Sequence, residues 1–290
     1  MIEVKNLSFS FKKKSIFENA SFDLEDGTIY GLVAPNGYGK TTLLQLIDGL
    51  IKPKAGEIKL FGKANKAVDK KEIAFLQDNT VLYPYLSSYD HLKFLCELHK
   101  LPISRIDQVA EQLKLAHFLH QKVKSYSLGM KQRLLLAMAI IKEPKVLLLD
   151  EPLNGLDPSS RLIVRETLLH LAENNVTMLI SSHDLSELDR LTKNIFFIRE
   201  KQVHFEKLQT VNNQHLSFTV ENPEEVLAIL TEHFTGEVEL VDDTFFLHFE
   251  SNQILAVLSL LVKHQITPLS LQAGELGSED RYKEMFGGEV

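Results

Sequence analysis

The stretch Ala34-Pro-Asn-Gly-Tyr-Gly-Lys-Thr-Thr42 constrains this 290-residue chain more than any other part of it. It follows a short apolar segment predicted as a strand, residues 29–33, and opens an apolar helical pattern, residues 41–50. A strand, a glycine-containing loop, Lys-Thr and a helix form a phosphate-binding arrangement. Glycine lets backbone N–H groups turn toward an anion, and the helix adds the positive end of its dipole. A glycine-rich turn without a chemical role is the alternative, which Lys-Thr in this register disfavours.

The side chains of this loop have distinct expected roles. We expect Lys40 to reach the β- and γ-phosphates and Thr41 to offer its hydroxyl to Mg²⁺, with Thr42 the next hydroxyl along. The usual pattern has glycine at position 34, so Ala34 preserves the loop only if this position needs no left-handed backbone. The nucleotide-binding residues expected from this stretch are Ala34, Pro35, Asn36, Gly37, Tyr38, Gly39, Lys40, Thr41 and Thr42.

The composition is that of a soluble globular protein, with 44% apolar and 24% charged residues. The longest apolar run, residues 254–262, is too short for a membrane span, which needs roughly 20 residues. Residues 1–5 lack a signal-peptide pattern. The single cysteine, Cys96, excludes an internal disulfide and fits a reducing cytoplasm.

Charge divides the chain near residue 210. Residues 1–209 hold 29 Lys/Arg and 25 Asp/Glu, whereas residues 210–290 hold 3 and 14. We therefore expect two domains, residues 1–210 and residues 211–290. The second has the pattern strand–helix–strand–strand–helix–strand, the ferredoxin-like order, and we expect it to serve regulation or packing. Its acidity argues against binding nucleic acid.

An apolar segment over residues 144–149 ends in Asp150 and Glu151. A strand of this composition is buried on both faces, and the carboxyl ends of such strands are where open α/β sheets bind ligands. We expect Asp150 to hold Mg²⁺ through water, and Glu151 to orient and polarise an attacking water. The alternative, a polar pair that merely ends a strand, is disfavoured by the phosphate loop elsewhere in the chain.

Other candidates lie on neighbouring segments. His183 ends the next predicted strand, so it should lie at the same sheet edge, with its N–H in reach of a γ-phosphate. Ser127 is a good N-cap and Gly129 leaves backbone open, which predicts either a simple capped helix or a second anion-binding helix end. Phe11 precedes a basic turn, and either stacks on a base or belongs to the core.

Together these segments resemble the ATP-binding subunit of an ABC (ATP-binding cassette) transporter over residues 1–210. Residues 34–42 match its Walker A loop, 126–130 its signature sequence, 146–151 its Walker B strand and 154–157 its D-loop, while His183 matches the switch histidine. The resemblance implies an α/β P-loop NTPase fold of ABC type. It has a mixed or parallel core sheet, an antiparallel β subdomain and a helical subdomain at about 88–142. It also places Phe11 where the family has its base-stacking aromatic.

The chain departs from the family pattern at two further places. In the signature, Leu128 replaces a glycine and Met130 replaces a glutamine, whereas Ser127 and Gly129, the anion-contacting pair, remain. At the Q-loop the family's glutamine position falls on Asp78, with Gln77 one residue earlier. A carboxylate at 78 would order a Mg²⁺-bound water at some repulsive cost against phosphate, and a local shift would put Gln77 there instead.

The resemblance implies ATP and Mg²⁺ as cofactors and hydrolysis of ATP coupled to transport. Two copies would pack head to tail, each ATP lying between Walker A of one and Ser127–Gly129 of the other. The insertion 88–142 and the loop 78–90 would grip a transmembrane permease, placing the chain peripherally at the cytoplasmic face of the membrane. The acidic C-terminal domain ending in residues 279–286 looks most like the ABC-2 type exporter branch.

Two other functions fit the sequence less well. A soluble ABC ATPase acting on ribosomes or DNA is disfavoured by the single Walker A loop, the absence of sustained heptads and the acidic C-terminal segment. A non-catalytic ATP-sensing module is disfavoured because Glu151 and His183 are both present.

Overall fold

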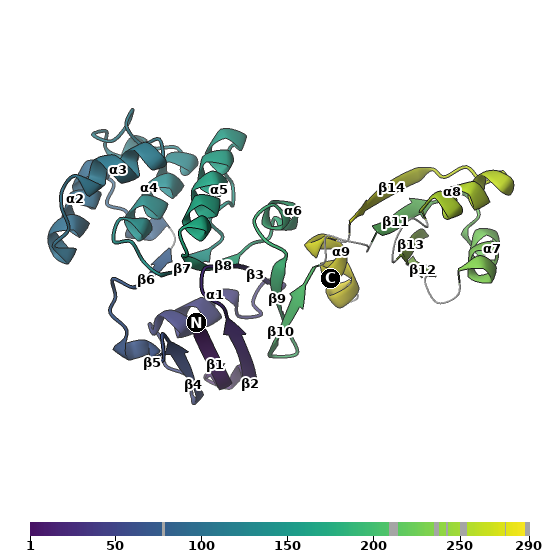
Figure 1. Ribbon diagram of the computed structural model, residues 1–290, viewed down its shortest axis with the longest axis horizontal. Coiled ribbons are helices and arrows are strands. Elements are labelled where there is room, and N and C mark those ends of the chain that lie inside the picture. The colour runs from purple at the N-terminus through teal and green to yellow at the C-terminus, as the bar shows by residue number, and fades with distance from the viewer. Residues whose placement is uncertain are drawn as a thin grey trace. The chain divides into compact units, whose positions relative to one another are not determined.

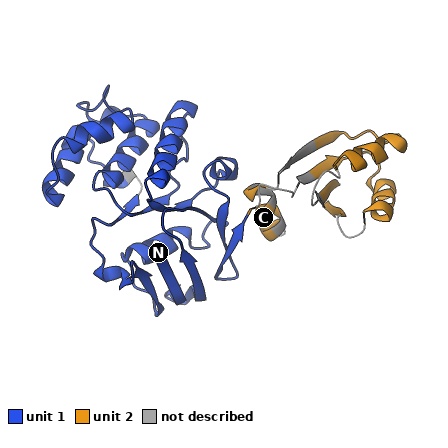
Figure 2. Ribbon diagram, in the orientation of Figure 1, with its two compact units in different colours: residues 1–207 blue, residues 208–290 orange. Residues whose placement is uncertain are grey.

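The computed structural model describes residues 1–76, 79–208, 214–234, 238–241, 243–249, 254–275 and 277–287. The chain forms two compact units, residues 1–207 and 208–290 (Figure 2). The boundary expected near residue 210 falls in 209–213, outside the described residues, so the domain assignment stays a prediction. Within the described part of the chain, none of the helices combines the length and apolarity that a membrane crossing requires.

The first unit begins with an antiparallel sheet in the order β2-β1-β4-β5 (Figure 1). The alternation of apolar and polar residues in the first two strands predicts one buried face, and Ile2, Val4 and Leu24 are indeed buried. The buried face belongs to a core shared with the following helix and the main sheet. The strands are β1 Ile2–Phe11, β2 Lys14–Leu24, β4 Ala55–Leu60 and β5 Lys63–Ala64.

The main sheet has six strands in the order β10-β9-β3-β8-β7-β6. All neighbours in it pair in parallel except β10, which forms an antiparallel hairpin with β9. Since the parallel strands run the same way, Val33, Asp150 and Ser181 end at one edge. The strands are β3 Ile29–Val33, β6 Ile73–Leu76, β7 Val146–Asp150, β8 Thr177–Ser181, β9 Asn194–Arg199 and β10 Gln202–Lys207.

Helices connect these strands and form a separate group between β6 and β7 (Figure 1). That group starts with a capping box, in which Ser87 and Asp90 satisfy each other's backbone N–H groups. Residues 113–127, which continue the predicted helical stretch, contain turns and one short 3₁₀ helix instead. The helices of this unit are α1 Lys40–Asp48, α2 Ser88–His99, α3 Arg105–Gln112, α4 Leu128–Ile140, α5 Pro158–Glu173 and α6 Leu185–Asp189.

The second unit has an antiparallel sheet in the order β12-β13-β11-β14, which confirms the predicted ferredoxin-like order. Its core, which includes Phe218, Leu230 and Phe245, is separate from that of the first unit. The last strand starts at Ser270, because the N–H of Ile266 still bonds back to the preceding helix. Helix α9 was not predicted. The elements are β11 Gln214–Thr219, α7 Pro223–His233, β12 Val238–Val241, β13 Thr244–Phe249, α8 Ile254–Lys263, β14 Ser270–Glu275 and α9 Ser278–Phe286.

Candidate active site

The loop between β3 and α1 turns left-handed at Gly37, with φ 80°, and at Gly39, with φ 107°. Ala34 does not have a positive φ, so the condition for tolerating alanine at this position is met. Gly39 is constrained a second time, because an added Cβ would lie 2.6 Å from the Cγ2 of Ile16. The loop therefore needs glycine where its backbone is left-handed, and not at position 34.

Lys40 is the first residue of α1 and is held inside the loop. Its side chain is 7% exposed, and its Nζ donates a hydrogen bond of 2.7 Å to the backbone oxygen of Ala34. Burial lowers the pKa of Lys40, while the nearby carboxylates of Glu151 and Asp150 act in the opposite direction. A desolvated ammonium of this kind gains much from a polyanionic ligand, so the arrangement suits phosphate binding.

Asp150 ends β7 with each carboxylate oxygen bonded to a hydroxyl. Thr41 Oγ1 donates to Oδ2 at 2.6 Å, and Ser181 Oγ donates to Oδ1 at 2.6 Å. A hydroxyl and a carboxylate side by side are the hard oxygen donors that Mg²⁺ prefers, so Thr41 and Asp150 fit the predicted metal role. Ser181 was not predicted from the sequence; the available signal was a serine at the end of a strand whose residues 178–180 are apolar.

Glu151 and His183 lie against each other beyond the strand ends. The backbone N–H of His183 donates to Glu151 Oε2 at 3.3 Å, and His183 Nε2 lies 2.9 Å from Oε1. That second approach is not a hydrogen bond, so Oε1, which is buried, has no hydrogen-bond donor among the described residues. Burial raises the pKa of Glu151, opposed by His183 and Lys40. A carboxylate of raised basicity beside the phosphate loop suits a general base.

A cavity of about 430 Å³ gathers these groups at the carboxyl edge of β3 and β7, two strands of the main sheet in Figure 1. Phe11, half exposed, lies at the same cavity, consistent with a ring available for stacking on a base. The residues that line it are Phe11, Lys14, Ile16, Pro35, Asn36, Gly37, Gly39, Lys40, Thr41, Thr42, Asp150, Glu151 and His183.

Some predicted residues do not line the cavity. The side chain of Ala34 is buried beneath the loop, and Tyr38 packs against the core of the first unit. Gln77 and Asp78 lie outside the described residues, so the choice between them stays open. Ser127 and Gly129 do not line the cavity of their own chain.

The start of α4, which carries the signature residues, packs against the start of α5. Ser127 is the predicted N-cap, since its Oγ accepts the N–H of Met130 at 3.2 Å. Gly129 differs from the expectation of open backbone, because it is buried. An added Cβ at Gly129 would lie 2.5 Å from Ser160 Oγ and 2.9 Å from Asp157 Oδ2. Glycine at this position therefore allows the two helices to approach closely.

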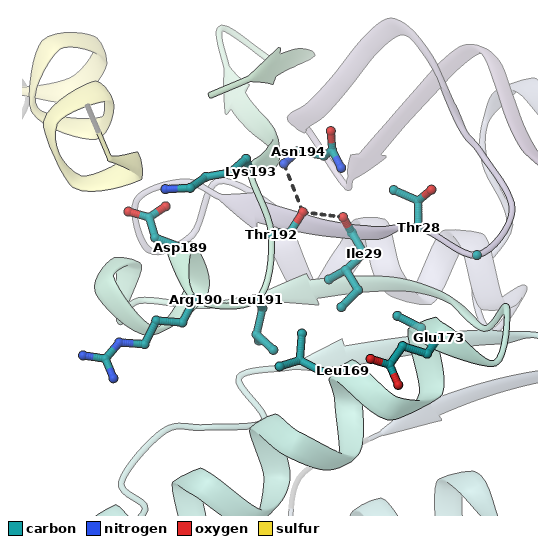
Figure 3. A pocket seen from close by; sticks show the side chains of 12 residues that line it. Thr28, Ile29, Leu169, Glu173, Asp189, Arg190, Leu191, Thr192, Lys193 and Asn194 are labelled. Atoms are coloured by element: carbon teal, nitrogen blue, oxygen red, sulfur yellow. Dashed lines mark hydrogen bonds between the residues drawn. The ribbon is translucent and has the colours of Figure 1, made fainter. Parts of the chain in front are cut away.

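A second cavity, of about 560 Å³, lies at the opposite sheet edge, where β3 and β9 begin (Figure 3). Thr192 points into this region, donating to the oxygen of Ile29 at 2.6 Å and accepting the N–H of Asn194 at 3.0 Å. The hydroxyl of Thr192 is already hydrogen-bonded within the chain, and the strands present their amino ends here, whereas ligands bind at carboxyl ends. We therefore assign this cavity no role in binding nucleotide.

Comparison with known proteins gives consistent matches. The profile of the ABC transporter family matches residues 17–154, and a profile for AAA domains matches residues 121–189. The ABC transporter ATP-binding protein YhcH of Bacillus subtilis is 33% identical over 99% of this chain and 96% of its own length. The bacitracin transport ATP-binding protein BcrA of Bacillus licheniformis is 31% identical over 99% of this chain and 98% of its own length. The lantibiotic transport ATP-binding protein SrtF of Streptococcus pyogenes is 36% identical over 71% of this chain and 90% of its own.

A solved structure of the ATP-binding subunit of an ABC transporter superposes with a TM-score of 0.66 at 25% identity, covering 72% of this chain and 90% of that one. The fold and the phosphate loop define a P-loop NTPase. The relatives matched over almost their whole length show that the chain belongs to the family of ABC transporter ATP-binding proteins, and it is an ATPase of that family.

Proposed function

We propose that this chain is the ATP-hydrolysing subunit that powers a membrane ABC exporter. The observation that carries the proposal is the single cavity in which a desolvated lysine, two acids and a histidine meet at the sheet edge. The relatives named for bacitracin transport and lantibiotic transport support the transport role. The direction of transport rests on the resemblance of the C-terminal segment to the ABC-2 exporter branch.

Each residue of the cavity has a role in this proposal. The loop N–H groups and Lys40 bind the β- and γ-phosphates, and the ring of Phe11 stacks on the base. Thr41 and Asp150 hold Mg²⁺, which neutralises charge on the phosphates when bound. Glu151 orients the attacking water and accepts its proton, while His183 contacts the γ-phosphate.

A second copy of the chain completes the site in this proposal. Ser127 caps α4 and is exposed, yet it does not line the cavity of its own chain. Placed against the triphosphate of a partner, it would supply a hydroxyl and a helix amino end. Such a pair has twofold symmetry, with ATP bridging the two copies and hydrolysis releasing them.

An exposed apolar strip on the helical group supports docking to a transmembrane permease. Phe94 and Leu98 lie one turn apart on α2, and each is 60% exposed. Tyr85, before the start of α2, is 65% exposed, and the ring of Tyr83 stacks on that of His91, a residue of α2. Clustered exposed aromatic and aliphatic side chains mark interaction surfaces. Through this strip the chain would be held peripherally at the cytoplasmic face of the membrane.

The Glu151→Gln variant tests the proposed hydrolysis. Because the amide cannot accept a proton from water, we expect turnover to fall by about 10²- to 10⁴-fold, and ATP to hold the variant as a dimer. Phosphate release and size-exclusion chromatography with Mg²⁺-ATP measure the two effects. Glu173→Gln, an exposed glutamate at the end of α5, is the matched control and should behave as the unaltered chain. Normal hydrolysis by Glu151→Gln would refute the base assignment.

A further inference from the structure

We propose that Ser181 is a positioning residue that holds both acids of the site, Asp150 and Glu151, in their working orientations. Ser181 is the last residue of β8 and is fully buried, with 0% exposure. Its Oγ donates to Asp150 Oδ1 at 2.6 Å and accepts the backbone N–H of Glu151 at 3.0 Å. One hydroxyl thus serves as donor to one acid and acceptor for the other.

The register of the sheet makes this contact specific. Asp150 and Ser181 face each other as paired residues of the parallel strands β7 and β8. Thr41 takes the second carboxylate oxygen of Asp150, so each of its two oxygens receives one hydroxyl. Two short hydrogen bonds on opposite oxygens fix the plane of the carboxylate against rotation. Ser181 thereby sets the direction in which Asp150 presents an oxygen to the metal position.

The second contact of Ser181 is to a backbone in an unfavourable conformation. Glu151 has φ 52°, a left-handed value that a non-glycine residue keeps only when its surroundings enforce it. Ser181 accepts the N–H of this same residue. In this conformation the Glu151 side chain lies beside His183. Without the hydroxyl, the N–H of Glu151 loses its acceptor and Asp150 loses one of its two restraints.

The inference rests on the proposed roles of Asp150 and Glu151, and it is independent of cargo and permease. The variant that tests it is Ser181→Ala in the full-length chain. The matched control is Thr177→Val, because Thr177 is also a buried residue of β8 whose hydroxyl accepts a backbone N–H, that of Gly27 at 3.0 Å, but at the opposite end of the strand. Both variants remove one buried hydroxyl from one strand.

We expect Ser181→Ala to lower kcat by about 10- to 100-fold, the usual effect of removing an outer partner of a metal-binding group. A readout without turnover uses Glu151→Gln and Glu151→Gln/Ser181→Ala with a fluorescent ATP analogue. The Mg²⁺ concentration that half-saturates binding should rise in the double variant, while binding in EDTA stays unchanged. Thr177→Val should alter the thermal midpoint alone.

Equal kcat and equal Mg²⁺ dependence in Ser181→Ala and the unaltered chain would overturn the inference, as would a matching kcat loss in Thr177→Val. If the alanine variant fails to fold, Ser181→Thr and Ser181→Val replace it, since they share a shape and differ only in the hydroxyl. The inference then requires higher kcat and tighter Mg²⁺ dependence for the threonine variant. Absence of ATPase activity in the unaltered chain, or full activity of Glu151→Gln, would instead refute the proposed function.

Discussion

Glu151 combines a buried carboxylate, a left-handed backbone and an acceptor oxygen without a donor among the described residues. Each of these features disfavours the folded chain in the absence of a ligand. Burial raises the pKa of Glu151 above its value in the unfolded chain, so the folded chain binds this proton more tightly. Stability from this group is therefore greatest at low pH and is lost as pH rises through the folded-state pKa.

This linkage predicts a pH-dependent stability difference between Glu151→Gln and the unaltered chain, both without nucleotide. Near the ordinary glutamate pKa of about 4.3 the two should melt alike, and above the raised pKa the variant should melt at the higher temperature. Thermal melts at a series of pH values measure the gap. In Glu173→Gln no gap should open, since that side chain is exposed. A gap for Glu151→Gln that does not change with pH would contradict the burial argument.

At the residue scale, the sequence predicts a residue that lines the cavity when its motif lies directly after a predicted strand. Lys40, Asp150, Glu151 and His183 follow from this logic, because parallel strands bring their carboxyl ends together. Ser181 does not, since its importance depends on which residue of β7 lies opposite it. That register is set by packing of both strands and not by any local pattern.

At the scale of elements, the contact between the starts of α4 and α5 depends on missing side chains. The side chains of Ser160 and Asp157 lie so close to Gly129 that a Cβ at this position would clash with them. Gly155, with φ 66°, faces Leu128, the residue that replaces the usual signature glycine. The sequence shows these glycines, but only the packing identifies them as contact positions. The same holds for the start of β14 and for α9, which tertiary context decides.

The Gly129→Ala variant should therefore displace Ser127 from its place at the start of α4. We expect ATP-dependent dimerisation to weaken, while binding of nucleotide to a single copy persists, because the phosphate loop is untouched. Size-exclusion chromatography in the Glu151→Gln background measures the dimerisation, and equilibrium ATP binding measures the affinity of a single copy for nucleotide. Adding Ser160→Gly removes the nearest clash, at 2.5 Å, and should restore part of the dimer. Unchanged dimerisation in Gly129→Ala would show that the contact tolerates a methyl group.

At the scale of the whole molecule, each of the two units has its own hydrophobic core. The core of the first unit contains the strands and helix that build the cavity, while the core of the second is formed by its own sheet and helices. SrtF matches 71% of this chain, and that match covers 90% of the length of SrtF.

A chain cut after Lys207 should consequently fold and hydrolyse ATP. The cut removes a segment in which Asp and Glu greatly outnumber Lys and Arg, so the remainder becomes net basic. Circular dichroism and phosphate release compare the shortened chain with the full one. Loss of folding would contradict the independence of the two cores, and loss of hydrolysis alone would show that the second unit contributes to turnover.

The position of Ser127 outside its own chain's cavity has a consequence for rate. If two chains must associate before either hydrolyses ATP, the turnover rate per chain depends on protein concentration. It then falls steeply in dilute solution. A membrane protein that holds one chain on each of two equivalent surfaces abolishes that penalty, since it makes the encounter intramolecular. Assembly on such a membrane protein would then limit ATP hydrolysis by chains that are not part of a transporter.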